Sequence, residues 1–390
     1  MKKILKRTVA TLLCIVLLLT GTCLLSHAES AESLEVVGRP SVSCKSAILM
    51  EASTGMVLYE QNADEALPPA SVTKVMTLLL IMEAIEAGKI RYTDTVSASA
   101  HACSMGGSQI FLEEGEKMTV EDLLKSVVIA SANDAAVALA EFVCGTEGAF
   151  VEQMNQKARE LGMEHTNFEN TNGLDDTAKN HVTSARDIAI MSRELMKYER
   201  ILHYSSIWMD TIRNGEFGLT NTNRLVRFYK GATGLKTGST AKAGFCISAT
   251  AERDGMSLIC VIMGADSRDV RNASAAALLD YGFANFTRYE PRNLYEGSIG
   301  VTGGVSPQCK VSASDVSMIL EKNKIQKINT VIQVPESLSA PVEKGEVIGK
   351  VILKIDDKEI GNAAIIAEES VDFIGFWGIL WRLVTYMSKY

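Results

Sequence analysis

Two residues near the amino-terminal third of the chain could together form a nucleophile. Ser71 and Lys74 are three residues apart, a spacing that puts both side chains on one face of a helix. A serine hydroxyl needs a base to attack a carbonyl carbon, and a lysine amine can be that base when burial lowers its pKa toward neutrality. The sequence therefore predicts Ser71 as a nucleophile and Lys74 as its base.

Two further groups contain residues that could act with this pair. Ser131 and Asn133 lie within an apolar segment that we expect to be helical, where small polar side chains are costly unless they find partners. Lys236, Thr237 and Gly238 lie at a strand beside a probable β-hairpin. Taken singly, the first group could be a helix packing contact and the second an exposed strand edge with a solvated lysine.

Signatures of several other chemistries are missing. The sequence has no GxSxG, HExxH or GxxxxGK motif, which disfavours an α/β-hydrolase, a zinc peptidase of that type and a P-loop nucleotide site. No histidine has a metal-ligand spacing, so we expect neither a metal nor an organic cofactor. The formal net charge of −8 repels phosphate, so nucleic acid is not an expected partner.

The elements that must position these residues are mostly helices and a few strands. The segment from 71 to 84 is predicted to be a helix, and because it is apolar nearly all round between 75 and 82, we expect it to be buried. Other helices are expected over residues 120–143, 149–161, 184–197 and 272–283. Strands are expected over residues 46–51, 56–60, 244–252 and 256–263.

The predicted hairpin of residues 244–263 separates two cysteines that could be mistaken for a disulfide. If Asp254 and Gly255 form the turn, Cys246 faces Met263 and Cys260 faces Ala249. The offset between the two thiols is then odd, so they point to opposite faces of the sheet. We interpret the cysteines after residue 28 as small buried apolar residues.

The two ends of the chain differ from its middle. Residues 1–28 have a cationic start, an apolar run and small residues before Glu29, which indicates a cleaved signal peptide, with an uncleaved anchor as the alternative. Residues 29–43 are expected to be a linker, and residues 289–370 a small β-rich domain. Residues 371–390 are aromatic and apolar around a polar stripe that includes Arg382. They predict a helix lying in a membrane interface or, alternatively, docked on the protein's own core.

The order SxxK, SxN and KTG, with the first group on a helix and the last on a strand, resembles the penicillin-recognising serine acyltransferases. Within that group the chain is similar to the low-molecular-weight D-alanyl-D-alanine carboxypeptidases over residues 40–390. The sequences of residues 171–174 and 234–238 also match. The resemblance implies an α/β (α+β) catalytic domain over residues 44–288, with a central antiparallel sheet and a helical subdomain. A small all-β domain and an amphipathic anchor helix are implied after it.

The resemblance also implies a role for each motif residue. Ser71 would form the acyl-enzyme, Lys74 would take its proton, and Ser131 would relay a proton to the departing D-alanine. The backbone N–H groups of Ser71 and Ser239 would form the oxyanion hole. The implied substrate-binding residues are Asn133, Arg224, Lys236, Thr237, Gly238, Ser239 and Arg271.

The substrate implied in this way is a peptidoglycan pentapeptide ending in D-Ala-D-Ala, cut outside the cytoplasm by an enzyme that β-lactams inhibit. Two alternatives stay open: a β-lactamase with the same acyl-enzyme chemistry, and a non-catalytic wall-binding or sensor protein of the same fold. Residues 131–133 read Ser-Ala-Asn rather than Ser-Asp-Asn, and no ExxLN stretch supplies the deacylating glutamate of a class A β-lactamase. Both features favour the carboxypeptidase.

Overall fold

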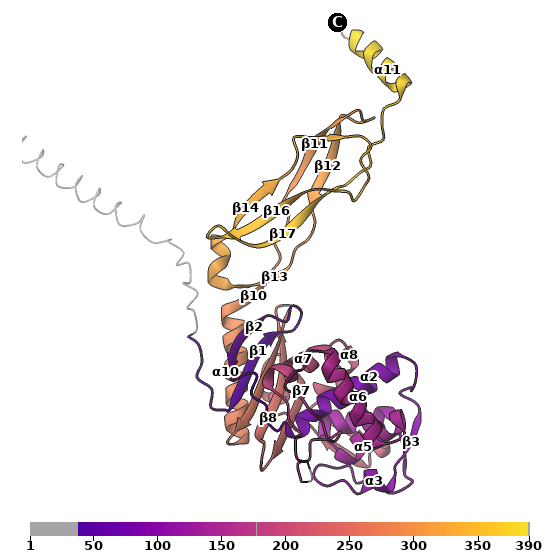
Figure 1. The fold of residues 1–390 in the computed structure, drawn as a ribbon, viewed down its shortest axis with the longest axis vertical. Coiled ribbons are helices and arrows are strands. Elements are labelled where there is room, and N and C mark those ends of the chain that lie inside the picture. Colours follow the sequence, from indigo (N-terminus) through magenta and orange to yellow (C-terminus); the bar gives the residue numbers. More distant parts are fainter. Residues whose placement is uncertain (1–37, 177, 389–390) are drawn as a thin grey trace, which may run out of the picture. The chain divides into compact units, whose positions relative to one another are not determined.

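The computed structural model describes residues 38–176 and 178–388 (Figure 1). The predicted signal peptide, residues 1–28, and most of the predicted linker therefore lie outside the described residues. Within them, the strand order β2-β1-β9-β8-β7 forms an antiparallel sheet in which the early strand β1 pairs with the late strand β9. The strands are β1 (Ser46–Glu51), β2 (Val57–Gln61), β7 (Ala232–Thr240), β8 (Gly244–Arg253) and β9 (Met256–Ala265). The predicted hairpin of residues 244–263 is confirmed, and the strands predicted over residues 46–51 and 56–60 are present as the antiparallel pair β1 and β2.

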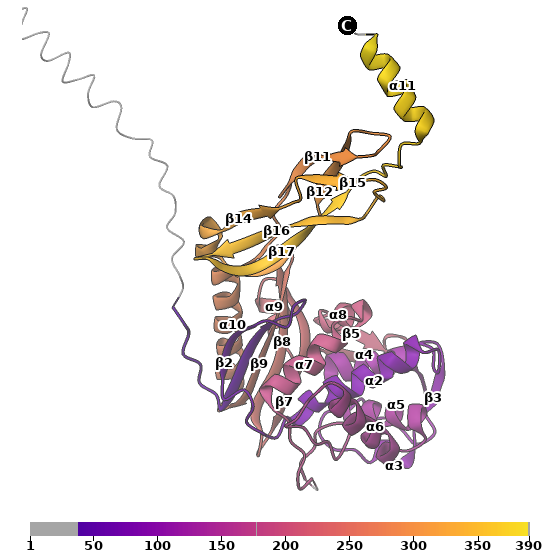
Figure 2. The ribbon, with the colours of Figure 1, turned by 45° about the horizontal axis from the view of Figure 1, so that its top comes forward.

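Helices cover both faces of this sheet (Figures 1 and 2). On one face lies α10 (Arg268–Asn285), whose Leu278 and Leu279 share a core with Leu49 of β1. On the other face lie α7 (Ala185–Leu195) and α2 (Lys74–Glu86), which share a second core with Ile48. Since alternate residues of a strand point to opposite faces, β1 contributes to both cores, and all six of its residues are buried.

The register of β8 and β9 confirms the predicted partner of Cys260 but not that of Cys246. Cys260 pairs with Ala249, and the ladder shifts between Phe245 and Ile247, so Cys246 lies at a bulge instead of opposite Met263. Cys246 belongs to the core on the α7 face and Cys260 to the core on the α10 face. Both are buried free thiols, and Cys309 is buried as well, as predicted. Cys44, Cys103 and Cys144 are only partly buried, so the interpretation as buried residues is wrong for these three.

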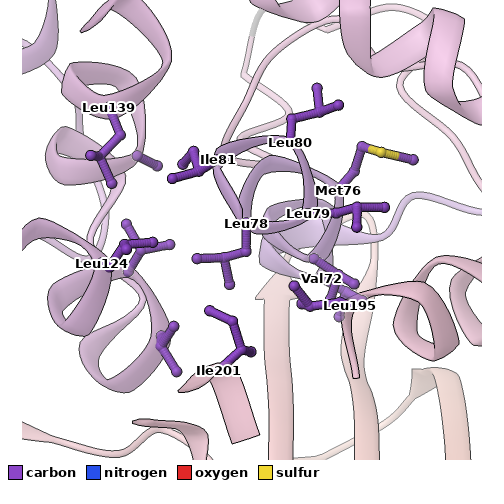
Figure 3. Close-up of a cluster of buried hydrophobic side chains, with 14 of the residues drawn as sticks. Val72, Met76, Leu78, Leu79, Leu80, Ile81, Leu124, Leu139, Leu195 and Ile201 are labelled. Atoms are coloured by element: carbon purple, nitrogen blue, oxygen red, sulfur yellow. The ribbon is translucent and has the colours of Figure 1, made fainter. Parts of the chain in front are cut away.

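The helix predicted from residue 71 is present and buried. It starts as a short 3-10 helix, η1 (Ala70–Thr73), and continues as α2, in which every residue from Lys74 to Met82 is buried. Figure 3 shows Leu78 and Ile81 pointing toward Leu124 and Leu139 of neighbouring helices. A helix that is apolar all round has no solvent face, so its surroundings must be other elements of the domain.

The prediction of a single helix over residues 120–143 is wrong. The segment divides into α4 (Val120–Lys125), a π-helical turn η2 (Ser126–Ala130) and α5 (Asn133–Cys144). Ser131 ends the first half with φ 63° and ψ 29°, a left-handed conformation that an α-helix cannot contain. The backbone groups freed by the break are taken by loops, since Asn133 N donates to Ser108 O and Thr222 N donates to Ile129 O.

The remaining predicted helices of this region are confirmed with shifted ends. The N-cap of α7 is Ser184, whose hydroxyl accepts a hydrogen bond from Asp187 N at 3.1 Å. Helix α10 begins four residues before the predicted start, because Ser267 caps it through Val270 N. The other elements are β3 (Thr95–Ser97), α3 (Ala100–Cys103), β4 (Lys117–Thr119), α6 (Glu147–Glu160), α8 (Glu199–Ser205), β5 (Met209–Ile212), β6 (Phe217–Thr220) and α9 (Leu225–Phe228).

After α10 the described chain is mainly β-structure. β10 (Phe286–Tyr289) pairs with β13 (Met318–Glu321), and a larger sheet has the order β14-β16-β17-β12-β11-β15. Alternate residues of its strands enter an apolar core that includes Val311, Val351 and Ile365. The strands are β11 (Glu296–Thr302), β12 (Gln308–Ala313), β14 (Asn329–Gln333), β15 (Ser337–Ser339), β16 (Val347–Ile355) and β17 (Lys358–Ala367).

The last described element is helix α11 (Phe376–Met387). Its aromatic side chains are open to solvent, with Trp377 77% exposed and Trp381 71% exposed. Arg382, on the polar stripe, donates to the backbone carbonyls of Gly304 and Val305 at 3.1 and 2.8 Å. None of the helices in the described ranges is long and apolar enough to cross a membrane.

Candidate active site

The three predicted groups, far apart in the sequence, meet at one cavity of about 140 Å³. Ser71 reaches it from η1, Ser131 from the break between η2 and α5, and Thr237 from the edge strand β7. The residues that line the cavity are Ser71, Ser108, Ser131, Thr222, Thr237, Gly238, Ser239, Arg268 and Arg271.

Lys74 lies beneath Ser71 with its amine fully enclosed. Its Nζ is 3.0 Å from Ser71 Oγ, 2.5 Å from Asn133 Oδ1 and 2.8 Å from the backbone carbonyl of Asn172. The two carbonyl oxygens can only accept hydrogen bonds, so they take both N–H groups of a neutral amine. The amine's lone pair is then left for Ser71, which must donate its hydroxyl proton. This arrangement orients Lys74 as a base toward Ser71.

The charge state of Lys74 follows from its surroundings. The side chain is buried, and burial holds the pKa of the ammonium well below its usual value, with the nearby charge of Lys236 adding to this effect. The more distant Asp134 acts in the opposite direction. The neutral amine is thus favoured, which is the form that can accept a proton from serine.

Asn133 is fixed by contacts on both sides of its amide. Its Nδ2 donates to Gly106 O at 2.6 Å, which identifies the opposite atom as Oδ1 and directs it at Lys74. The following residue, Asp134, is fully buried and accepts hydrogen bonds from the backbone N–H groups of Ile110 and Leu112. Asp134 therefore holds the loop that includes Ser108 against the start of α5.

Ser131 is paired with the second buried lysine. Lys236 Nζ donates to Ser131 Oγ at 2.8 Å and to Thr237 O at 2.7 Å. Burial lowers the pKa of Lys236 to about 7, and the nearby Arg271 contributes to the shift. Near neutral pH the Lys236 amine therefore exchanges protons readily, and Ser131 offers a hydroxyl through which such a proton can pass to the cavity.

Strand β7 lies so close to η1 that only glycine fits at residue 238. A Cβ at Gly238 would come within 2.6 Å of the backbone nitrogen of Ser71. The next residue, Ser239, also lines the cavity, while Thr237 Oγ1 donates to Thr222 Oγ1 at 2.8 Å. The backbone at Ser71 and at Ser239 is thereby brought to the same opening.

The two predicted arginines differ in their relation to the cavity. Arg271 lines it, is only 3% exposed, and has a pKa lowered to about 10 by burial and by neighbouring positive charge. Arg224 is exposed at the start of α9 and is not among the lining residues, although its charge contributes to the shift at Arg271. A direct contact of Arg224 with substrate stays a prediction.

Several residues at the site were not predicted from the sequence. Asn172 supplies a carbonyl to Lys74, and Gly173 next to it has φ +85° and packs so tightly that a Cβ would overlap Ala70 O. The signal that pointed to them was the match of residues 171–174 to the family. Ser108, Thr222 and Arg268 lie outside every motif, and no spacing indicated them.

The turn that carries the nucleophile is supported from behind by His181. Its Nδ1 accepts from Glu169 N, so its Nε2 carries the proton and donates to Thr73 Oγ1 at 2.8 Å. Thr73 in turn donates to Ala70 O within η1. Burial lowers the pKa of His181 to about 4, so the ring is neutral at physiological pH. His181 therefore acts as a neutral hydrogen-bonding support behind η1.

Comparison with known proteins places this geometry in a family. A family described as D-alanyl-D-alanine carboxypeptidase matches residues 33–267. The chain belongs to this family. A second match, described as the penicillin-binding protein 5 C-terminal domain, covers residues 305–372. The resemblance drawn from the three motifs is confirmed, as are the enzyme class, a serine hydrolase of the carboxypeptidase type, and the fold class.

Individual relatives support the assignment over nearly the whole chain. The D-alanyl-D-alanine carboxypeptidase DacF of Bacillus subtilis (strain 168) is 42% identical over 384 residues, covering 96% of this chain and 98% of the relative. Penicillin binding protein 5 from Haemophilus influenzae has a similar structure, with 32% identity, a TM-score of 0.71, and coverage of 86% of this chain and 99% of that chain. Penicillin-Binding Protein D2 from Listeria monocytogenes, solved in an ampicillin-bound form, is 30% identical with a TM-score of 0.58, covering 63% of this chain and 100% of that chain.

Proposed function

We propose that this protein removes the terminal D-alanine from peptidoglycan stem peptides through an acyl-enzyme on Ser71, and that β-lactams block it by acylating the same hydroxyl. The observation that carries the proposal is the buried Lys74 amine, 3.0 Å from Ser71 Oγ, with its two N–H groups engaged by Asn133 and Asn172. A base in this position can generate a serine nucleophile without a histidine.

In the first half of the reaction, Ser71 Oγ attacks the carbonyl carbon between the two D-alanines while Lys74 takes the hydroxyl proton. The negative charge that develops on the carbonyl oxygen is stabilised by the backbone N–H groups of Ser71 and Ser239, an effect commonly worth about 3 kcal/mol per donor. The proton that Lys74 has taken is relayed through Ser131, with Lys236 behind it, to the amide nitrogen, so the C–N bond breaks, D-alanine leaves as the free amine and Lys74 is neutral again.

In the second half, water attacks the ester carbon of the acyl-enzyme. Lys74 accepts a proton from the water, and the same amine returns a proton to Ser71 Oγ as the ester C–O bond breaks. Thr237, Lys236 and Arg271 bind the terminal carboxylate of the substrate before the first half, with Gly238 leaving room for the strand to approach Ser71. Asn133 holds Lys74 and contacts the substrate amide.

We further propose that the enzyme acts outside the cytoplasm and is held at a membrane surface by α11. Support comes from the signal-like residues 1–28 and from the exposure of Phe376, Trp377 and Trp381, since a helix docked on its own core would bury them. Deletion of residues 371–390 is expected to move the protein from the membrane pellet to the supernatant. Continued pelleting of the shortened chain would contradict the anchor.

The division of the chain that accompanies this function is also a proposal. It has a signal peptide (residues 1–28), a linker (residues 29–43), a catalytic domain (residues 44–288), a β-rich domain (residues 289–370) and the anchor (residues 371–390). The family matches at residues 33–267 and 305–372 support a boundary between them.

The function is tested by two assays on the purified chain. Incubation with a peptide ending in D-Ala-D-Ala should release D-alanine, and incubation with benzylpenicillin should give a long-lived adduct that mass spectrometry locates on Ser71. The variant Ser71→Ala should do neither while keeping the thermal stability of the parent. Rapid release of hydrolysed penicillin would instead favour a β-lactamase. No turnover of either compound by the parent would favour a non-catalytic wall-binding or sensor protein.

A further inference from the structure

A second arginine, Arg268, lines the cavity although no motif includes it. Arg268 is the first residue of α10 and precedes Arg271 by three residues, so the two side chains leave the same face of the helix. Arg268 is exposed, and within the described residues no carboxylate lies at ion-pair distance from it, even though Asp266 and Asp269 are close in sequence. A free guanidinium therefore faces the opening of the site.

Arg271, in contrast, is held in place. Its Nη2 and Nε donate to Asn272 Oδ1 at 2.9 and 3.1 Å, and its Nη1 donates to Cys246 O at 3.4 Å. The side chain is 3% exposed and has no acidic partner, so its charge acts as a fixed feature of the cavity wall. Arg268 is the nearby positive charge with the largest influence on it.

The charges around the cavity are all of one sign. Arg268 and Arg271 line it, Lys236 lies behind Ser131, and the remaining lining residues are hydroxyl-bearing side chains and a glycine. Like charges gathered without a counter-charge repel one another, and a bound anion relieves the repulsion. This part of the site is built for a negatively charged group.

We infer that Arg268 is a specificity-determining residue that selects peptides with a free carboxyl-terminal carboxylate. The inference rests on the proposed function. Arg271 provides a fixed charge on the inner wall of the cavity. Arg268, whose side chain is exposed and has no ion-pair partner, binds the carboxylate from the solvent side. A guanidinium and a carboxylate can form two parallel hydrogen bonds between opposite charges, whereas a carboxamide offers one neutral oxygen and an NH2 group that cannot accept, so it loses the ion pair and one of the bonds. Arg268 thereby favours removal of a single terminal residue over cleavage within a longer chain.

The experiment compares two peptides that differ only in charge: one ending in D-Ala-D-Ala carboxylate and the same peptide ending in the carboxamide. Release of the last residue is measured for the full chain and for Arg268→Gln, Arg268→Lys and Lys242→Gln. Lys242 is the matched control, because it is an exposed cation after β7 that donates to Asp175 O and does not line the cavity.

We expect Arg268→Gln to lower kcat/KM for the carboxylate peptide about 10- to 100-fold, mainly through KM, the size expected for loss of one hydrogen bond to a charged group. The carboxamide peptide should be cleaved equally by both proteins. Arg268→Lys should recover part of the loss, and Lys242→Gln should match the parent.

Two results overturn the inference while leaving the proposed function intact. One is an Arg268→Gln enzyme whose kcat/KM values for both peptides equal those of the parent. The other is an Arg268→Gln enzyme whose kcat/KM falls equally for both peptides. Circular dichroism and the melting temperature establish that the variant is folded, as expected for an exposed residue at a helix start. A parent enzyme that releases D-alanine from neither peptide would overturn the proposed function and this inference together.

Discussion

The cleft around Ser71 and the β-sheet of residues 296–367 bury different kinds of side chain. The cleft encloses Lys74, Lys236 and Arg271, whereas every buried side chain after residue 289 in the described part of the chain is apolar or a glycine. Burial of an ionisable group costs free energy unless partners compensate it, and it shifts the group's pKa. The contrast indicates that burial in the first region costs stability and shifts pKa values, whereas the described core of the second region has no buried ionisable group to impose that cost.

The largest effect that this comparison predicts is the loss of peptide turnover when Ser131 is replaced. Replacement Ser131→Ala removes the hydroxyl between Lys236 and the cavity, so peptide turnover should fall about 10²- to 10⁴-fold, the range for loss of a proton-transfer group. The matched control is Ser126→Ala, which removes a buried hydroxyl five residues earlier that bonds only Asp122 O. Steady-state release of D-alanine measures both, and equal rates in the two variants would contradict the assignment.

A second prediction concerns an apolar residue in the core of the β-sheet. Ile365→Ala in the β-sheet leaves a cavity in an apolar core, and we expect it to lower the free energy of unfolding of that region by about 2–5 kcal/mol. Because Ile365 has no link to the site, the rate of acylation by benzylpenicillin should stay within about twofold of the parent. Denaturant unfolding and acylation kinetics provide the two measurements. A large loss of acylation in a folded variant would show that the regions are coupled.

A third effect, small for each pH unit, is a pH dependence of stability. The pKa of Lys236 is near 7 in the folded protein and about 10.4 in the unfolded chain, so the unfolded state binds more protons between these values. Stability should therefore rise with pH from about 7 to 10, by at most about 1.4 kcal/mol per pH unit from this group. Below pH 7 its contribution is flat. The melting temperature of the parent minus that of Lys236→Met measures this contribution and should increase from pH 7 to pH 10. A value that falls over this range would contradict the burial of a neutral amine.

These two regions also explain how far the sequence could predict the structure. Ser71 and Lys74 were identified because a spacing of three on a helix is a local rule. The β-rich domain after residue 289 was identified because short β-branched runs separated by glycine and proline are typical of strands. In both cases the information lies within a few residues of the feature itself.

The break at Ser131 could not be predicted in this way. The apolar run continues across it, and the left-handed backbone there is maintained by contacts with the loops at Ser108 and Thr222. Arg268 was missed for a different reason: Arg271 was identified from the resemblance to the family, and Arg268, three residues earlier, lies outside every motif of that resemblance. Positions that depend on contacts between distant segments leave no local signal in the chain.

The central claim is that the buried Lys74 amine activates Ser71, and the most direct test is the rate of Ser71 acylation by benzylpenicillin in the parent and in Lys74→Ala. Mass spectrometry follows the adduct, and the melting temperature establishes that the variant is folded. We expect acylation to slow by about 10²- to 10⁴-fold when the base is lost. An adduct on Ser71 that forms at the parent's rate in folded Lys74→Ala would contradict the account.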